Sequence, residues 1–173
     1  MCIRDRPQDA DAIRNDGFTN VIPIEEIKTI DGISIYRTTG HHGFGQIGQM
    51  MGPVSGYVLK AEGFPTVYIM GDCRWEACIR DTVERFNPDY IVVNSGGAIF
   101  PEFSKTDGPI IPDENEVMQI LDELPSHIKL IAVHMDAIDH CQTTRAILRN
   151  EATHHEADMS RLIIPEDGET VVL

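Results

Sequence analysis

The sequence lacks long apolar runs and an excess of basic residues. No stretch of about 18 apolar residues occurs in the 173-residue chain, so no transmembrane helix is expected. Residues 1–17 also lack the apolar segment of a secretory signal peptide. Lys and Arg number 14 against 28 Asp and Glu, and the formal net charge is −14. An acidic surface repels phosphate backbones and anionic lipids, so neither nucleic acid nor a membrane is an expected partner.

Cysteines that could form a disulfide framework are also scarce. The chain has four, of which Cys2 lies at the extreme N-terminus. The other three, Cys73, Cys78 and Cys141, form no CxxC pair and are odd in number. This pattern argues against structural disulfides and for a reducing compartment, so we expect a cytoplasmic protein.

The first six residues, MCIRDR, resemble a translated sequencing adapter. We therefore assign residues 1–6 to an artefact and residues 7–173 to a single truncated domain. On this interpretation the chain starts inside a gene, and a larger N-terminal portion of the domain is missing. The 42% hydrophobic content, the scattered Pro and Gly residues and the lack of repeats agree with one domain.

Apolar periodicity predicts an α/β domain in which strands come first and then alternate with helices. We expect strands at residues 33–39, 55–63, 65–72, 89–97 and 128–134, the second and third forming a hairpin. We expect helices at residues 74–86, 113–124 and 141–152. Asp113 is a suitable N-cap for the second helix and Pro125 a suitable stop. Residues 161–173 are typical of two short strands around a turn at Asp167-Gly168.

A glycine-rich turn, GFGQIG, spans residues 43–48 and follows the first of these strands. It matches the GxGxxG pattern of dinucleotide-binding domains, in which glycines let the backbone approach a pyrophosphate. Two features weaken that interpretation. Gly52-Pro53 stops any helix after one or two turns, and Glu62 lies at a hairpin bend rather than after a crossover. A nucleotide-binding α/β domain that uses Gly43, Gly45 and Gly48 stays open as an alternative.

Metal-binding residue types follow three of the expected strands. His41 and His42 come after the first, Asp72 comes after residues 65–70, and His134 comes after residues 128–133. Neutral imidazole and carboxylate groups bind divalent metals, and the carboxyl ends of strands in α/β sheets are common ligand sites. Each residue alone has an ordinary structural explanation; Asp72, for example, could cap the next helix. The joint pattern favours a metal site.

The chain resembles the C-terminal part of the metallo-β-lactamase-fold hydrolases, in the branch that includes the ascorbate-phosphate lactonases. The residues that carry the likeness are 40–59 (GHHGFGQIGQMMGPVSGYVL), 66–75 (TVYIMGDCRW), 88–98 (PDYIVVNSGGA), 131–145 (IAVHMDAIDHCQTTR) and 164–169 (IPEDGE). The resemblance implies part of an αββα sandwich of two sheets with helices outside. It also implies a site for one or two metal ions at one edge of the sandwich.

The same resemblance implies a role for each metal-binding residue. His42, directly before the glycine-rich loop, corresponds to a ligand of the first metal, with His41 as the fallback. Asp72 corresponds to the carboxylate that bridges both metals and takes part in catalysis. His134 corresponds to a ligand of the second metal, with His140 as the fallback. Zinc is the preferred assignment, and manganese or iron would suit the same ligands.

The family also carries an HxHxDH run upstream of these residues, and this chain has no HxH sequence. The chain therefore offers three of about six expected ligands. For the complete protein the resemblance implies a metal-bound hydroxide that cleaves an ester, a lactone or a phosphodiester of a small molecule. We expect the 173-residue chain alone to be inactive.

Two further expectations concern surfaces. Half of a two-sheet sandwich would leave an apolar face that a homo-oligomer or a swapped segment could cover. Residues 100–112 form the candidate specificity loop, in which Lys105 could meet an anionic group. A catalytically dead relative that serves as an interaction module is the second alternative to the hydrolase.

Overall fold

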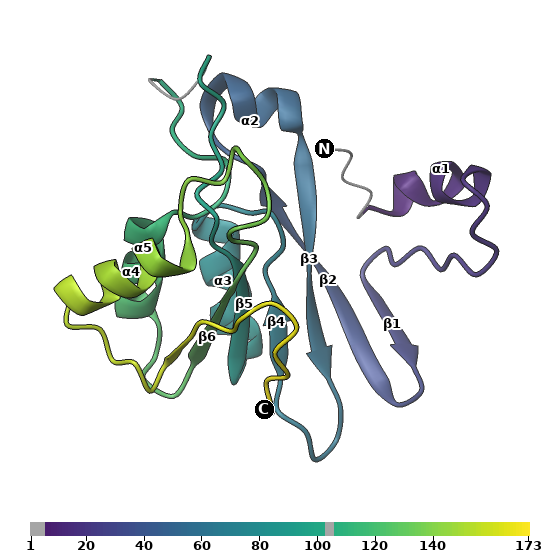
Figure 1. The fold of residues 1–173 in the computed structure, drawn as a ribbon. Coiled ribbons are helices and arrows are strands. Elements are labelled where there is room, and N and C mark those ends of the chain that lie inside the picture. The colour runs from purple at the N-terminus through teal and green to yellow at the C-terminus, as the bar shows by residue number, and fades with distance from the viewer. Residues whose placement is uncertain (1–5, 103–105) are drawn as a thin grey trace.

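This computed structural model describes residues 6–102 and 106–173. These residues fold around one seven-stranded sheet whose strands lie side by side in chain order, β1 to β7 (Figure 1). Most of the adapter-like hexapeptide, together with Cys2 and Lys105, lies outside the described residues. The strands are β1 (Ile27–Ile30), β2 (Ile33–His41), β3 (Pro53–Lys60), β4 (Val67–Ile69), β5 (Tyr90–Asn94), β6 (Lys129–Val133) and β7 (Leu162–Ile163).

Five α-helices and one short 3-10 helix accompany the sheet in the described residues. They are the 3-10 helix η1 (Pro7–Asp9), α1 (Ala10–Asn15), α2 (Gly45–Met51), α3 (Ala77–Phe86), α4 (Glu114–Glu123) and α5 (Arg145–His154). The predicted α/β class is confirmed, as are the strands that became β2 to β6. The three predicted helices correspond to α3, α4 and α5, and Asp113 caps α4 by accepting a hydrogen bond from the Glu116 backbone.

The prediction of two short strands in residues 161–173 is confirmed for the first strand, β7, and for the turn at Asp167-Gly168, and it is wrong for the second strand. In the described residues, the pairing with β6 extends over Leu162–Ile163 as β7. The carbonyls that follow are used otherwise, because Ile164 accepts a hydrogen bond from Arg149 and Pro165 accepts one from Arg145. Pro165 also has no N–H to donate to a ladder. Strand β1 and helix α1 were not predicted, because residues 7–30 show no clear apolar periodicity.

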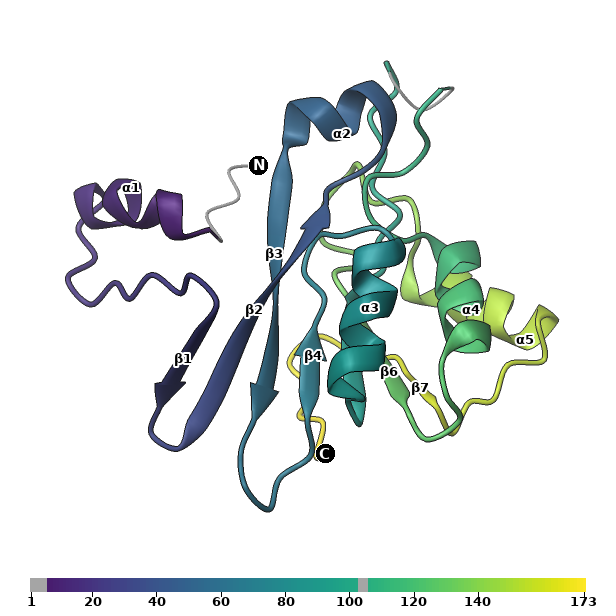
Figure 2. The ribbon, with the colours of Figure 1, turned by 180° about the vertical axis from the view of Figure 1, so that it is seen from behind.

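Helices α3, α4 and α5 cover one face of the sheet, as the back view in Figure 2 shows. Alternate strand residues point into this layer, and Val58, Tyr68, Ile91 and Leu130 are fully buried there. The helices contribute the apolar faces that their periodicity predicted, including Ile79, Ile120 and Leu148. This layer holds the main core.

The opposite face of the sheet is also apolar but is only partly covered. Strand register aligns Tyr57, Ile69, Val92, Ile131 and Ile163 in one row across five strands. The C-terminal segment after β7 crosses this side of the sheet, in front of the strands in Figure 1 and behind them in Figure 2. Ile69 in this row is still 39% exposed, which is consistent with a sheet face that is only partly covered.

Strand direction decides where the candidate ligands lie. β2 and β4 are each antiparallel to β3, and β4, β5 and β6 are parallel to one another. The carboxyl ends of β2, β4, β5 and β6 therefore meet at one edge of the sheet, beneath α2 in Figure 1. Within the described part of the chain, no helix is both long enough and apolar enough to cross a membrane.

Candidate metal centre

His42 is the first residue after β2, and it is almost completely buried, with 1% of its surface exposed. Its Nδ1 lies 2.8 Å from the main-chain oxygen of Asp72. A carbonyl oxygen can only accept, so Nδ1 carries the proton and the lone pair of the neutral ring is on Nε2. A histidine whose second nitrogen donates to a carbonyl is the usual arrangement of a metal ligand. The chemistry of His42 therefore fits a divalent cation.

Asp72 follows β4 after a sharp turn at Gly71. Gly71 has φ +75°, and a Cβ at this position would lie 2.6 Å from the main-chain oxygen of Ser55 on β3. Only glycine suits this combination of a left-handed backbone and close approach. The Asp72 carboxylate then accepts a hydrogen bond of 2.6 Å from Asn94, the last residue of β5. The sequence interpretation missed Asn94, although it ends a strand at the same edge.

The segment after Asp72 is fixed by a buried ion pair. The Arg74 guanidinium donates to Glu116 on α4 over 2.5 Å, and the Trp75 main chain donates to the same carboxylate over 2.7 Å. The Arg74 main chain donates to the carbonyl of His41 over 3.1 Å. Burial raises the pKa of Glu116, and the charge of Arg74 opposes that shift. Helix α4 is thereby tied to both strand ends that carry His42 and Asp72.

His41, the first fallback ligand, lies elsewhere. Its main-chain N–H and its Nδ1 both meet the Glu76 carboxylate, at 2.8 Å and 2.9 Å. Its side chain is 61% exposed, in contrast to buried His42. Neighbouring residues at a strand end point to opposite faces, which explains the contrast. The structure therefore separates His41 from the side of the chain where His42 meets Asp72.

His134 is the first residue after β6 and has a left-handed backbone, with φ +64°. Its Nδ1 lies 3.7 Å from the Cys141 sulfur. Burial raises the pKa of the Cys141 thiol, and the negative charge of Asp72 raises this pKa further. His140, the second fallback, stacks on Phe100 with ring centres 5.5 Å apart.

The structure therefore brings only two of the three candidate ligands into contact in the described residues. The His42 ring contacts the main chain of Asp72, whereas His134 lies against Cys141, which is not a candidate ligand. Strands β4 and β6 are separated by β5, which places their axes roughly 10 Å apart. In residues 6–102 and 106–173, no group of three or more His, Cys, Asp or Glu side chains is close enough to hold a metal ion. The joint site of His42, Asp72 and His134 stays a prediction.

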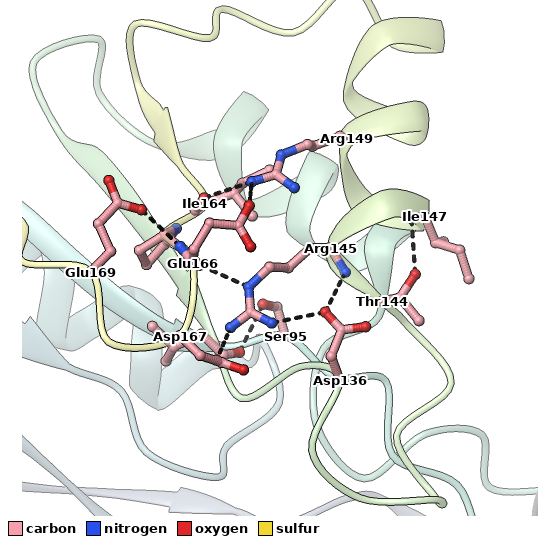
Figure 3. A network of polar contacts seen from close by, with 12 residues as sticks. Ser95, Asp136, Thr144, Arg145, Ile147, Arg149, Ile164, Glu166, Asp167 and Glu169 are labelled. Carbon is pink, nitrogen blue, oxygen red and sulfur yellow. Dashed lines mark hydrogen bonds and ion pairs between the residues drawn. The ribbon is translucent and has the colours of Figure 1, made fainter.

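A polar network holds the loop that carries His134 (Figure 3). Arg145, the first residue of α5, donates to the Asp136 carboxylate from its main chain over 3.1 Å and from Nη1 over 2.9 Å. Its other guanidinium nitrogens donate to the carbonyl of Pro165 over 2.7 Å and to Asp167. Burial lowers the pKa of Arg145, but the hydrogen bonds to Asp167 and Asp136 outweigh it and raise the pKa overall.

The glycine-rich turn has an internal structural role. A Cβ on Gly48 would lie 2.3 Å from the main-chain oxygen of Gly43, and a Cβ on Gly43 would lie 2.8 Å from Ile110. The Ile47 main-chain N–H in the first turn of α2 donates to the Asp107 carboxylate over 2.8 Å. A carboxylate thus stands where a phosphate would bind at a helix N-terminus. This arrangement is unfavourable for the nucleotide-binding alternative.

Among the described cysteines, Cys73, Cys78 and Cys141 are not in disulfide bonds, which agrees with the prediction of no disulfide framework. Cys73 is fully buried, and its thiol donates to the carbonyl of Met70. It therefore packs as a small apolar residue.

Comparison with known proteins finds a curated relative of this chain. No protein-family profile matches the chain. The UPF0173 protein YddR of Bacillus subtilis (strain 168) is 32% identical over 164 residues, which cover 94% of this chain and 62% of YddR. The chain thus spans less than two thirds of the length of this relative.

Solved structures of two hydrolases and of a metallo-β-lactamase fold protein also match the chain. A possible metal-dependent hydrolase from Veillonella parvula DSM 2008 matches with a TM-score of 0.89 and 30% identity, over 98% of this chain and 65% of that protein. An isothiocyanate hydrolase from Delia radicum gut bacteria matches with a TM-score of 0.87 and 33% identity, over the same shares of the two chains. The metallo-β-lactamase fold protein YhfI from Bacillus subtilis shares the fold at 15% identity, with a TM-score of 0.56 over 91% of this chain and 60% of YhfI. The chain therefore has the α/β architecture of the metallo-β-lactamase fold, and its likeness to metal-dependent hydrolases supports that superfamily.

Proposed function

We propose that these residues form part of a metal-dependent hydrolase that cleaves an ester, a lactone or a phosphodiester of a small molecule. The observation that carries the proposal is the contact between His42 and Asp72. The ring of His42 is buried, and its proton is fixed on Nδ1 by the Asp72 carbonyl. The contact is with the main chain of Asp72, and the carboxylate of the same residue is held by Asn94. A neutral imidazole and a carboxylate are donors that zinc, manganese and iron accept.

The residues of the chain would act as ligands and as supports for ligands. His42 would bind through Nε2, Asp72 through its carboxylate and His134 through its ring. A bound divalent cation would lower the pKa of a water molecule and polarise the bond to be cleaved. Asn94 holds the Asp72 carboxylate from β5, and Cys141 lies against His134. Zinc is our preferred metal, because two imidazoles and a carboxylate suit it well.

We propose that the remaining ligands come from an HxHxDH segment outside these 173 residues, as in the lactonase-like branch of the superfamily. Two observations support this proposal. The described residues bring no three metal-binding side chains together, and YddR is longer than the part that this chain matches. On this proposal the chain alone binds one metal weakly and does not turn over substrate.

Isothiocyanates are a second candidate substrate class. The isothiocyanate hydrolase is 33% identical over 98% of this chain, which is a specific likeness. The carbon of an isothiocyanate is electrophilic, so the same activated water that attacks an ester could attack it. Water would add across the C=N bond to give a thiocarbamic acid, which breaks down to an amine and carbonyl sulfide. No group leaves in the attack itself, and the ligands that the site requires are the same for both classes.

The test compares the 173-residue chain with a version extended upstream to include an HxHxDH segment. Each is assayed for Zn²⁺ binding by calorimetry and for turnover of a lactone, bis-p-nitrophenyl phosphate and allyl isothiocyanate. We expect turnover from the extended protein alone, and its loss in His42→Ala and Asp72→Ala. Turnover by the shorter chain at ordinary enzymatic rates would refute the proposed division of the ligands. Unchanged function in both variants would instead support the interaction module.

A further inference from the structure

The backbone of the loop after β6 is unusual at two positions. His134 has φ +64° and Asp136 has φ +60°, and neither is a glycine. Residues with side chains adopt this left-handed conformation at a cost, so surrounding contacts must hold them there. The direction in which the His134 ring leaves the end of β6 depends on this backbone. Whatever fixes the loop therefore also fixes the ring.

Arg145 makes the contacts that hold the loop. Its main-chain N–H and its Nη1 both meet the same oxygen of Asp136, at 3.1 Å and 2.9 Å. The side chain of Arg145 is 12% exposed and that of Asp136 is 33% exposed, so solvent screens this ion pair only in part. The main-chain N–H belongs to the first turn of α5, where a carboxylate is also favoured by the helix dipole.

The other side of the Arg145 guanidinium holds the C-terminal segment. Nε donates to the carbonyl of Pro165, and Nη2 donates to Asp167. Figure 3 shows the guanidinium between Asp136 and Asp167, with the start of α5 above the loop. One planar group thus joins the start of α5 to the loop after β6 and to the C-terminal segment. A lysine could not reproduce this arrangement, because its ammonium group is a point charge without a fixed fork.

Arg149, one turn later on α5, provides a matched comparison. It binds the same C-terminal segment, donating to the carbonyl of Ile164 over 3.0 Å and to Glu166 over 2.7 Å. Within the described part of the chain these contacts lie on the segment and not on the loop after β6. Both arginines therefore bind the C-terminal segment, and Arg145 also forms an ion pair with Asp136.

We propose that Arg145 is a positioning residue for His134, acting through Asp136 to hold the loop after β6 in its left-handed conformation. The proposal deepens the proposed function, since His134 is the candidate ligand from β6. It also gives the C-terminal segment a role, because Pro165 and Asp167 hold the guanidinium from the opposite side. Residues that orient metal ligands typically change metal affinity by about 10- to 100-fold when they are removed.

The test has a metal-free readout and a metal readout, both on the 173-residue chain. The carbon chemical shifts of His134 and Asp136, which report φ, are measured by NMR in Arg145→Ala, Arg145→Lys and Arg149→Ala without metal. We expect both Arg145 variants to lose the left-handed shifts at the two positions, and Arg149→Ala to keep them. The Zn²⁺ dissociation constant should rise about 10- to 100-fold in Arg145→Ala and less than about tenfold in Arg149→Ala.

Asp136→Ala is the second probe, because it removes the acceptor of both Arg145 hydrogen bonds and leaves α5 intact. The carbon shifts of His134 should move away from left-handed values in this variant even if Arg145→Ala does not fold. Left-handed shifts of His134 that persist in both Arg145→Lys and Asp136→Ala would overturn the proposal, as would an equal loss in Arg149→Ala. If the unmodified chain binds no Zn²⁺, the metal site of the proposed function fails for this chain, while the metal-free shifts still decide the role of Arg145.

Discussion

Removing the Arg74 guanidinium should destabilise the protein strongly and in a pH-dependent manner. Arg74 donates to Glu116 over 2.5 Å, and the two side chains are 14% and 9% exposed. In Arg74→Ala the Glu116 carboxylate stays buried with the Trp75 main-chain N–H as its remaining strong donor, at 2.7 Å. Taking one partner from a buried ion pair costs about 3–5 kcal/mol, because the other charge is left without compensation. The Trp75 hydrogen bond places this case near the lower end, at about 3 kcal/mol.

The pH dependence follows from the pKa of Glu116. Burial already raises this pKa above the ordinary value of 4.5 although Arg74 opposes the shift, so removal of Arg74 must raise it further. A carboxyl group whose folded pKa lies above its unfolded pKa favours folding when it is protonated. Stability therefore falls as pH rises from about 4.5 to the folded pKa, and stays low above it. The loss of unfolding free energy in Arg74→Ala, relative to the wild type, should be small near pH 5 and reach its full size near pH 8.

Urea denaturation at pH 5 and pH 8 would test this reasoning, with the wild type, Arg74→Ala and Arg74→Ala/Glu116→Gln compared. The double variant removes the buried charge and keeps a hydrogen-bond acceptor, so it should be more stable than Arg74→Ala at pH 8 and similar to it at pH 5. At pH 8 the melting temperature of Arg74→Ala should fall by roughly 6–12 °C. A loss below about 1 kcal/mol, or one that is equal at both pH values, would refute the argument.

Three other changes have effects that the structure specifies. Asp113→Ala removes the N-cap of α4 and should cost about 1 kcal/mol in urea denaturation; no change would mean that water replaces the cap. Gly71→Ala and Gly63→Ala both place alanine at a positive φ, of +75° and +76°, but only at Gly71 would the Cβ meet another atom within 4 Å. Gly71→Ala should therefore cost about 1–3 kcal/mol more in the same assay, and equal losses would count against the close contact with β3. Glu123 has its pKa lowered to about 2, chiefly by its hydrogen bond from Arg80, so its stabilising effect should be present above about pH 4.5 and be lost as pH falls toward 2. Glu123→Gln should reduce the loss of stability between pH 5 and pH 2 by less than about 1 kcal/mol, because the Arg80–Glu123 pair is exposed. An unchanged loss of stability over this pH range would contradict the assignment.

Local pattern was sufficient to predict most of the elements that form the sheet edge. Strands β2 and β5 and helices α3 and α4 follow from apolar periodicity, because each buries one face in the main core. The position of His42, Asp72 and His134 at the ends of β2, β4 and β6 also follows from the sequence, since each residue comes within three positions of the end of an apolar strand. Parallel strands bring such ends to a common edge whatever their separation along the chain.

The partners that orient these residues could not all be predicted in the same way. The contact of Asp72 with Asn94 joins adjacent strands, and the strand-end rule could have included Asn94 as well. Strand alternation could have separated His41 from His42. The ion pair between Arg145 and Asp136 depends on where α5 packs, and the sequence around Arg145 contains no local pattern that predicts this ion pair.

The direction of each candidate ligand is the least predictable feature, and the reason is geometric. Asp72 follows Gly71, which has φ +75°, and His134 has φ +64° itself. The alternation of side chains along a strand holds only while the backbone stays extended. A left-handed residue turns the chain, so a side chain that follows it no longer keeps the face that strand periodicity assigns. At β4 and β6 the sequence can therefore predict which residue stands at the edge, but the contacts from Asn94 and from Arg145 through Asp136 decide where it points.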